Sequence, residues 1–246
     1  MSLRDRIRKL FFKQKEKDPP AGYDLWAGSY DNQPDNLMLA LDELVFSALL
    51  KETSLAGRTV LDIGCGTGRH WNKFQVQSPG RLVGYDVSGA MLDKLKIKFP
   101  GAEIFLGKGS FLPEMKDHSC HLIVSTLTIA HIENLKEAFT EWDRVLQPGG
   151  EIIFTDYHPK ALARGGKRTF RHEGKQVAVK NYIHSIDTIR QLARQLHFRE
   201  LRFMERMIDD AVKDYYVKQN ALSLFEQYRG TPIIYGIHLK KADDPA

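Results

Sequence analysis

Short apolar runs rich in β-branched residues alternate with stretches of helical periodicity along most of the chain. The apolar runs predict strands at 60–63, 81–86, 102–106, 121–127, 151–157, 199–205 and 233–239. The helical periodicity predicts helices at 37–50, 89–99, 134–146 and 186–196, and a further helix that begins near residue 69. Such alternation is typical of an α/β fold, in which helices cover both faces of a largely parallel sheet.

Two segments interrupt the alternation and are predicted to be insertions, at about 159–183 and 209–230. The first contains a β-hairpin at 168–182 that turns at Glu173-Gly174. The second is helical and rich in aromatic residues. Residues 22–56 are predicted to form an N-terminal helical cap, and residues 1–21 a basic segment and linker that ends in Pro19-Pro20. Residues 22–246 are therefore expected to form a single domain.

Three glycines at alternate positions follow the first predicted strand, at Gly64, Gly66 and Gly68. Glycine permits positive φ and allows a ligand to approach the backbone closely. If a helix begins after them, its free N–H groups favour a negatively charged ligand. The same glycines also suit a tight strand-to-helix turn that binds nothing.

An acid at the end of the second predicted strand favours the ligand-binding interpretation. Asp86 lies about 20 residues beyond the glycines. A nucleotide-binding α/β unit places a carboxylate there, on the ribose hydroxyls.

The glycine spacing distinguishes between two families that share this plan. Dinucleotide sites use Gly-x-Gly-x-x-Gly, whereas this chain has Gly-x-Gly-x-Gly with Asp62 in the preceding strand. That string resembles the first motif of the class I S-adenosylmethionine-dependent methyltransferases, and the segment from Asp86 to Leu92 resembles their second motif. The resemblance covers about 23–157. It is closest to the small-molecule group, which includes quinone-biosynthesis and carrier-protein-ester methyltransferases.

The resemblance implies a seven-stranded Rossmann-like methyltransferase sheet with an antiparallel last strand, and S-adenosylmethionine as cofactor. It places a cap tyrosine, Tyr30, over the cofactor. The family usually has an acid or amide near the adenine in the loop after the third strand; here Lys108, Gly109 and Ser110 occupy those positions. The residues implied to bind the cofactor are Tyr30, Asp62, Gly64, Cys65, Gly66, Gly68, Asp86, Val87, Met91, Gly109, Ser110 and Ser125.

Candidates for work on the methyl acceptor lie after the fourth and fifth predicted strands, because ligands bind at the carboxyl edge of a parallel sheet. His131 is the first choice for general base, since a neutral imidazole works near pH 7. His184 is the second choice, Tyr182 is expected to orient the acceptor, and His158 is a weaker candidate. Asp156 is the one acid at these two strand ends, so no metal site is predicted.

Composition and charge restrict the partners. The chain has 246 residues, 42% of them hydrophobic, and a net charge of +5. No apolar run approaches the roughly 18 residues of a membrane-spanning helix, no signal peptide is recognised, and two cysteines suggest no disulfide framework. A cytoplasmic protein is expected. Residues 1–17 carry +5 and residues 160–180 carry +6, so the rest of the chain sums to −6.

These charges favour weak contact of residues 1–17 with a membrane surface over a nucleic-acid interface across the whole domain. The predicted function is transfer of a methyl group from S-adenosylmethionine to a small or lipid-like organic acceptor, at oxygen or an activated carbon. The alternatives are a nucleic-acid methyltransferase, a nicotinamide-dependent oxidoreductase and a non-catalytic binding module on the same fold. No Asp/Asn-Pro-Pro-Tyr string follows the fourth strand, which disfavours methylation of a flipped adenine.

Overall fold

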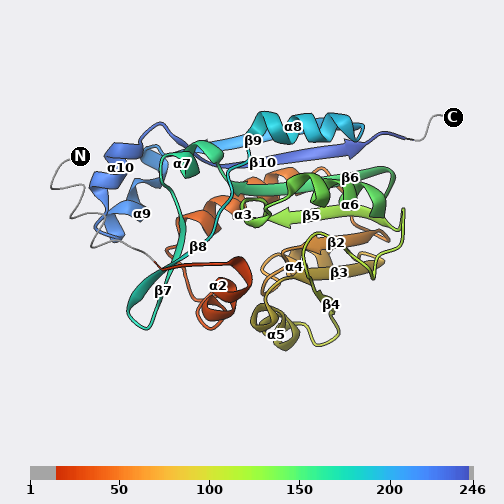
Figure 1. Cartoon of the computed structure of the whole chain (residues 1–246), viewed down its shortest axis with the longest axis horizontal. Helices are drawn as coiled ribbons and strands as arrows, with labels where there is room; N and C mark the ends of the chain where they lie inside the picture. The colour runs from red at the N-terminus through yellow and green to blue at the C-terminus, as the bar shows by residue number, and fades with distance from the viewer. Residues whose placement is uncertain (1–14, 244–246) are drawn as a thin grey trace.

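A seven-stranded sheet runs through the middle of the computed structural model, which describes residues 15–243. Its strands lie in the spatial order β4-β3-β2-β5-β6-β10-β9 (Figure 1). The bounds are β2 Thr59–Ile63, β3 Arg81–Asp86, β4 Glu103–Leu106, β5 Cys120–Thr126, β6 Leu146–Tyr157, β9 Phe198–Met207 and β10 Pro232–Lys241. β10 pairs antiparallel with both β6 and β9, and the remaining pairs are parallel. The predicted fold, including its antiparallel last strand, is confirmed.

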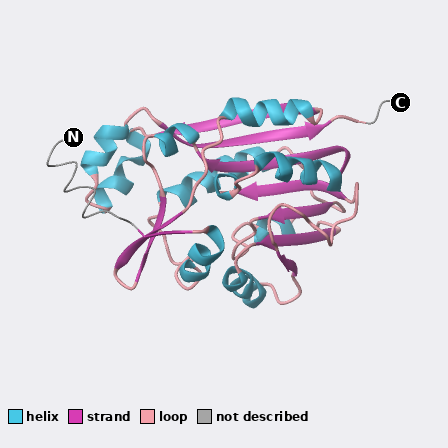
Figure 2. Cartoon of the chain, viewed as in Figure 1, coloured by secondary structure: helices cyan, strands magenta, loops and turns pink. Residues whose placement is uncertain are grey.

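Helices cover both faces of this sheet, as Figure 2 shows in cyan against the magenta strands. α3 (Leu37–Leu50), α4 (Trp71–Gln75) and α5 (Gly89–Lys98) cover one face, whereas α6 (Leu135–Val145) and α8 (Ile186–Gln195) cover the other. Successive strand residues point to opposite faces, so Leu122 contributes to one core and Ile123 to the other. This two-sided burial is why the strands are continuous apolar runs.

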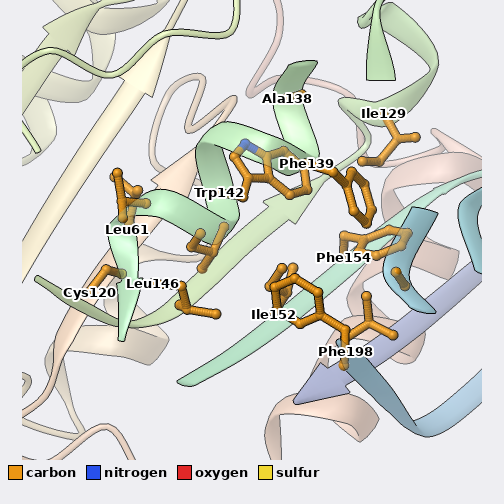
Figure 3. Close-up of a cluster of buried hydrophobic side chains, with 14 of the residues drawn as sticks. Leu61, Cys120, Ile129, Ala138, Phe139, Trp142, Leu146, Ile152, Phe154 and Phe198 are labelled. Atoms are coloured by element: carbon orange, nitrogen blue, oxygen red, sulfur yellow. The ribbon is translucent and has the colours of Figure 1, made fainter. Parts of the chain in front are cut away.

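The core under α6 is aromatic, and Figure 3 shows it in close-up. Phe139 and Trp142 stack on one helix with ring centroids 5.1 Å apart. Phe139 also meets Phe154 of β6 edge to face at 6.2 Å, which fixes the helix against the centre of the sheet. Ser88 and Ser185 cap α5 and α8, and they accept hydrogen bonds from the first-turn N–H groups of Met91 and Thr188.

A second, three-stranded sheet was not predicted. β7 (Arg168–His172) and β8 (Lys175–Val179) form the expected hairpin, and β1 (Lys15–Lys17) pairs parallel with the free edge of β8. α2 (Pro19–Trp26) follows directly. The expectation of a linker up to Pro20 is therefore wrong, because β8 offers unpaired backbone groups and proline is well tolerated in the first turn of a helix. The basic N-terminal segment up to residue 14 lies outside the described residues.

The small sheet lies beyond one end of the large sheet, on the left in Figure 1, together with α7 (Pro159–Ala163), α9 (Lys213–Lys218) and α10 (Leu222–Tyr228). Two short 3-10 helices complete the fold of the described residues, η1 at Ile129–His131 and η2 at Asp210–Val212. The second insertion consists of η2, α9 and α10 and is helical as expected. Within residues 15–243, no helix is both long and apolar enough to cross a bilayer.

A buried carboxylate, Asp42, connects three of these parts. It lies on α3, is 0% exposed, and accepts hydrogen bonds from Arg69, His70 and Thr155. Arg69 and His70 follow the glycine loop, and Thr155 lies on β6. Burial alone would raise the pKa of Asp42, but Arg69 and His70 outweigh it and hold the pKa below its ordinary value.

Removal of this charge should destabilise the fold strongly. Asp42→Asn leaves Arg69 without its buried partner, so the free energy of unfolding should fall by about 3–5 kcal/mol in urea titrations. Glu52→Gln is the matched control. Glu52 pairs with Arg202 at 2.9 Å but its side chain is 66% exposed, so the loss should stay below about 1 kcal/mol. Equal losses in the two variants would contradict this interpretation of Asp42.

Candidate functional site

Two features shape the glycine loop: its left-handed backbone conformation and its close approach to Thr128. Gly64, Gly66 and Gly68 have φ values of 74°, 53° and 74°. A Cβ on Gly64 would lie 2.0 Å from Oγ1 of Thr128, so a side chain cannot be accommodated there. The N–H groups of Gly64 and Cys65 both donate to the carbonyl of Tyr85, at 2.7 and 3.0 Å. The loop is thereby held against the carboxyl end of β3.

Asp86 lies at that end and closes the turn. Its Oδ2 accepts from the N–H of Gly66 at 2.8 Å, and its Oδ1 accepts from the N–H of Ser88 at 2.9 Å. Burial raises the pKa of Asp86 to about 6, although these N–H donors act in the opposite direction. Each oxygen retains a lone pair for a further donor, such as a hydroxyl group of a ligand.

A cavity of about 550 Å³ opens above Asp86 and the glycines. The residues that line it are Pro19, Tyr23, Tyr30, Ile63, Gly64, Gly66, Tyr85, Asp86, Val87, Met91, Gly107, Gly109, Ser110, Leu112, Thr126, Leu127, Thr128, His131, Ile132, Glu133, Asn134, Glu137, Ala138 and Trp142. A Cβ on Gly66 or Gly109 would meet no atom within 4 Å, so both positions leave open space beside the backbone.

Two acids attach the cap to the rim of this cavity. Asp24 of α2 accepts from the hydroxyl of Ser88 at 2.6 Å and from the N–H of Ala90 at 3.2 Å, at the start of α5. Asp31 accepts from the hydroxyl of Thr67 at 2.6 Å and from Lys98 at 3.0 Å. These contacts hold the aromatic residues of the cap over the glycine loop.

The cap and the end of β5 bring Tyr23 and His131 together. The hydroxyl of Tyr23 lies 2.9 Å from Nε2 of His131, and Nδ1 of His131 lies 2.8 Å from the carbonyl of Lys180. A carbonyl only accepts, so Nδ1 carries the proton and Nε2 is the acceptor that faces Tyr23. Burial and the charge of Arg168 lower the pKa of His131 to about 4, so the ring is neutral at pH 7.

The cavity includes eight of the twelve residues predicted for the cofactor, and four lie outside its lining. The four are Asp62, Cys65, Gly68 and Ser125. Asp62 is buried and accepts from the indole N–H of Trp71 at 2.9 Å, and burial raises its pKa to about 7. Cys65 packs against Gly84, Gly68 packs against Leu95, and the hydroxyl of Ser125 is buried without a hydrogen-bond partner.

Of the residues predicted for the acceptor, His131 is the one that lines the cavity. Nε2 of His184 lies 2.7 Å from the carbonyl of Ile132, and the hydroxyl of Tyr182 donates to Glu133 at 3.0 Å. His158 is buried with its Nε2 3.3 Å from Glu205. The polar atoms of His184 and Tyr182 contact residues beside the cavity, whereas His158 contacts β9, and the structure does not bring these three side chains into the cavity. Within residues 15–243, no cluster of three potential metal ligands is found.

Comparison with known proteins identifies the family. The family model of the methyltransferase domain matches residues 61–154, which span β2 to β6 and include the glycine loop, Asp86 and His131. The match covers less than half of the chain, and it shows that this segment is a methyltransferase domain.

Individual relatives of the chain are distant. It is 29% identical over 158 residues to the malonyl-[acyl-carrier protein] O-methyltransferase of Hamiltonella defensa. The aligned segment covers 63% of this chain and 58% of that protein. It is 23% identical over 214 residues to the demethylmenaquinone methyltransferase of Chlorobaculum parvum. Here the aligned segment covers 77% of this chain and 88% of that protein. Across three of the curated relatives, the chain spans only 30%, 52% and 58% of their length.

Solved structures agree on the fold. An S-adenosylmethionine-dependent methyltransferase from Mesorhizobium loti superposes with a TM-score of 0.61 at 18% identity, over 80% of this chain and 95% of that one. The open backbone at Gly66 and Gly109 and the carboxylate of Asp86 fit S-adenosylmethionine. Gly64 and Gly66 would approach the amino-acid end of this cofactor, and Asp86 would accept from its ribose hydroxyls.

Sequence reasoning missed Asp24, which connects the cap to α5, and Leu127, which has a left-handed φ of 56° at the end of β5. For Asp24, two acids among the aromatic residues of the cap were the available signal. Nothing in the sequence indicated the left-handed backbone at Leu127, because leucine rarely adopts it.

Cofactor affinity should depend on pH through Asp86. A protonated carboxyl accepts ribose hydroxyls poorly, and with a pKa of about 6 only about a tenth of Asp86 is ionised at pH 5. Calorimetry should therefore show S-adenosylhomocysteine binding about tenfold more weakly at pH 5 than at pH 7.5. Asp86→Asn should bind weakly at both values. A wild-type affinity that does not change with pH would contradict this role.

Proposed function

We propose that this methyltransferase transfers a methyl group to a small or lipid-like organic acceptor, at an oxygen or an activated carbon atom. The observation that carries the proposal is the Tyr23–His131 pair, a neutral imidazole with its basic nitrogen at the wall of the cofactor cavity. Bound S-adenosylmethionine supplies an electrophilic methyl group on a sulfonium centre. The chain then has to position the acceptor, exclude water and receive a proton.

The Tyr23–His131 pair suits the last of these tasks. The carbonyl of Lys180 holds the Nδ1 proton, which leaves Nε2 to take a proton from the acceptor directly or through the hydroxyl of Tyr23. A base with a pKa near 4 accepts a proton only from a fairly acidic group. An acidic O–H or an activated C–H therefore suits this site better than an alcohol.

The enclosure of the cavity supports a small acceptor over a polymer. Tyr23, Trp26 and Tyr30 pack against one another, with ring centroids 5.2 to 6.3 Å apart, above the glycine loop. A polymer needs an open groove at this position. The printed names of two relatives, one an O-methyltransferase of a carrier-protein ester and one a methyltransferase of demethylmenaquinone, are consistent with such acceptors.

An acceptor panel tests the proposal. The protein is incubated with S-adenosylmethionine labelled in its methyl group and, separately, with a malonyl carrier protein, a demethylated quinone, a small-molecule cell extract and bulk tRNA. Label is expected in one of the first three samples. Label confined to tRNA would favour the nucleic-acid alternative, and tight binding of NAD without methyl transfer would favour the oxidoreductase.

Loss of the base should reduce turnover and leave the cofactor site intact. With the acceptor that the panel identifies, His131→Ala should lower kcat by roughly a hundredfold. Its affinity for S-adenosylhomocysteine should stay within about twofold of that of the wild type. His172→Ala, a histidine near the hairpin turn, is the matched control and should retain activity. If His184→Ala loses activity and His131→Ala retains it, the base has been assigned to the wrong residue.

We further propose a cytoplasmic protein that contacts membranes weakly through its basic N-terminal segment, residues 1–17. Basic residues near an anionic surface contribute about 1 kcal/mol each. Deletion of residues 1–14 keeps β1 and removes five of the seven basic residues in that segment. The shortened chain should sediment less with phosphatidylserine vesicles, and neither chain should sediment with neutral ones. Equal sedimentation of both chains would refute the membrane contact.

A further inference from the structure

Arg168 is a buried cation without a partner. It begins β7, and only 5% of its surface is exposed. Its Nε and Nη1 atoms are both shielded from solvent and make no hydrogen bond. Within residues 15–243, no carboxylate oxygen lies within 4.0 Å of its guanidinium nitrogens, so Arg168 forms no ion pair there. The nearest favourable contact described is with the ring of Trp26, whose centroid lies 5.7 Å away.

A buried charge of this kind is costly unless something pairs with it. Arg69, which is also largely buried, has the carboxylate of Asp42. The charge of Asp156 acts on Arg168 from beyond ion-pair distance. Its two oxygens already accept from the N–H groups of Ala130 and Tyr157, both at 2.6 Å. Nε and Nη1 of Arg168 therefore have no acceptor among the described residues, and a carboxylate that enters beside the guanidinium group would supply one.

Arg168 lines a second cavity, of about 460 Å³, on the far side of the aromatic cap. Its other lining residues are 33–38, Trp26, Tyr157, Lys167, Thr169, Tyr215, Tyr216, Gln219 and Ile233. The other charged groups of this lining are paired, because Lys167 lies 3.4 Å from Glu16 and Asp35 lies 2.8 Å from Lys218. The cavity thus combines one unpaired positive charge with several aromatic faces.

This second cavity adjoins the cofactor cavity. Trp26, which lines it, stacks on Tyr23 at 5.7 Å and meets Tyr30 at 5.2 Å, and both tyrosines line the cofactor cavity. The charge of Arg168 also acts on Tyr23 and His131. The charge of an anion held by Arg168 would therefore also act on the groups expected to receive the proton.

We propose that Arg168 binds a carboxylate group of the methyl acceptor. This assignment rests on the proposed function and narrows it to acceptors that carry a carboxylate. A guanidinium group can donate two parallel hydrogen bonds to a carboxylate, which is the geometry its planar fork favours. A single unpaired cation matches a monoanion better than a doubly charged phosphate. The aromatic faces of Trp26, Tyr157, Tyr215 and Tyr216 pack against the organic remainder of the acceptor.

Carboxylate probes test the assignment in the full chain saturated with S-adenosylhomocysteine. Thermal shift and calorimetry compare acetate, butyrate and benzoate with their neutral amides, for the wild type, Arg168→Met, Arg168→Lys and Arg171→Gln. Arg171 is an exposed cation on the same strand and serves as the matched control. At least one acid should bind the wild type and Arg171→Gln tenfold or more tightly than its amide does. This preference should disappear in Arg168→Met and weaken several-fold in Arg168→Lys.

Three results would overturn the proposal. The first is a wild type that shows no preference for any acid over its amide. The second is a folded Arg168→Met or Arg168→Lys variant with the full wild-type preference. The third is an affinity for S-adenosylhomocysteine that falls tenfold in Arg168→Met while that for 5′-methylthioadenosine is unchanged, since this assigns Arg168 to the carboxylate of the cofactor. A wild type that binds no S-adenosylhomocysteine would instead refute the proposed function.

Discussion

A single buried carboxylate holds the glycine loop in place relative to the sheet. Asp42 has no contact with solvent, and its two oxygens accept from Arg69 and His70 just after the loop and from Thr155 near the carboxyl end of β6. In an apolar interior such a group is tolerated only when donors surround it. The exit of the loop, the first long helix and the central strand must therefore be assembled together, and the floor of the cofactor cavity follows from that assembly.

Patterning predicted the sheet and its chemistry well for an identifiable reason. β3 and β5 are buried on both faces, so each is a run of apolar residues that periodicity alone reveals. Once strand order is given, the carboxyl edge of the sheet is fixed, and residues that follow strands, such as Asp86 and His131, lie there. Ser125 shows the limit of this argument. It lies inside a strand, at a position whose side chain points into the core.

Contacts between segments that are distant in the sequence could not be predicted in the same way. Tyr23 and His131 are 108 residues apart and meet only because α2 is held over the end of β5. Arg168 looks like any other member of the basic run at 160–180, since sequence does not reveal which residue of an edge hairpin turns inward. The pairing of β1 with β8 was missed for the same reason, because it depends on an edge that exists only after the hairpin has formed.

The small sheet also has a mechanical consequence. Three register pairs join β1 to β8, and Trp26 stacks on Phe170 of β7 with ring centroids 4.7 Å apart. α2 starts two residues after β1, so it cannot swing outward alone: the hairpin must travel with it, or these contacts must break. Tyr23 of α2 lines the cofactor cavity, and Trp26 of the same helix lines the neighbouring cavity. An outward movement of α2 would therefore open both cavities together, and exchange of the donor would be coupled to exchange of whatever occupies the neighbouring cavity.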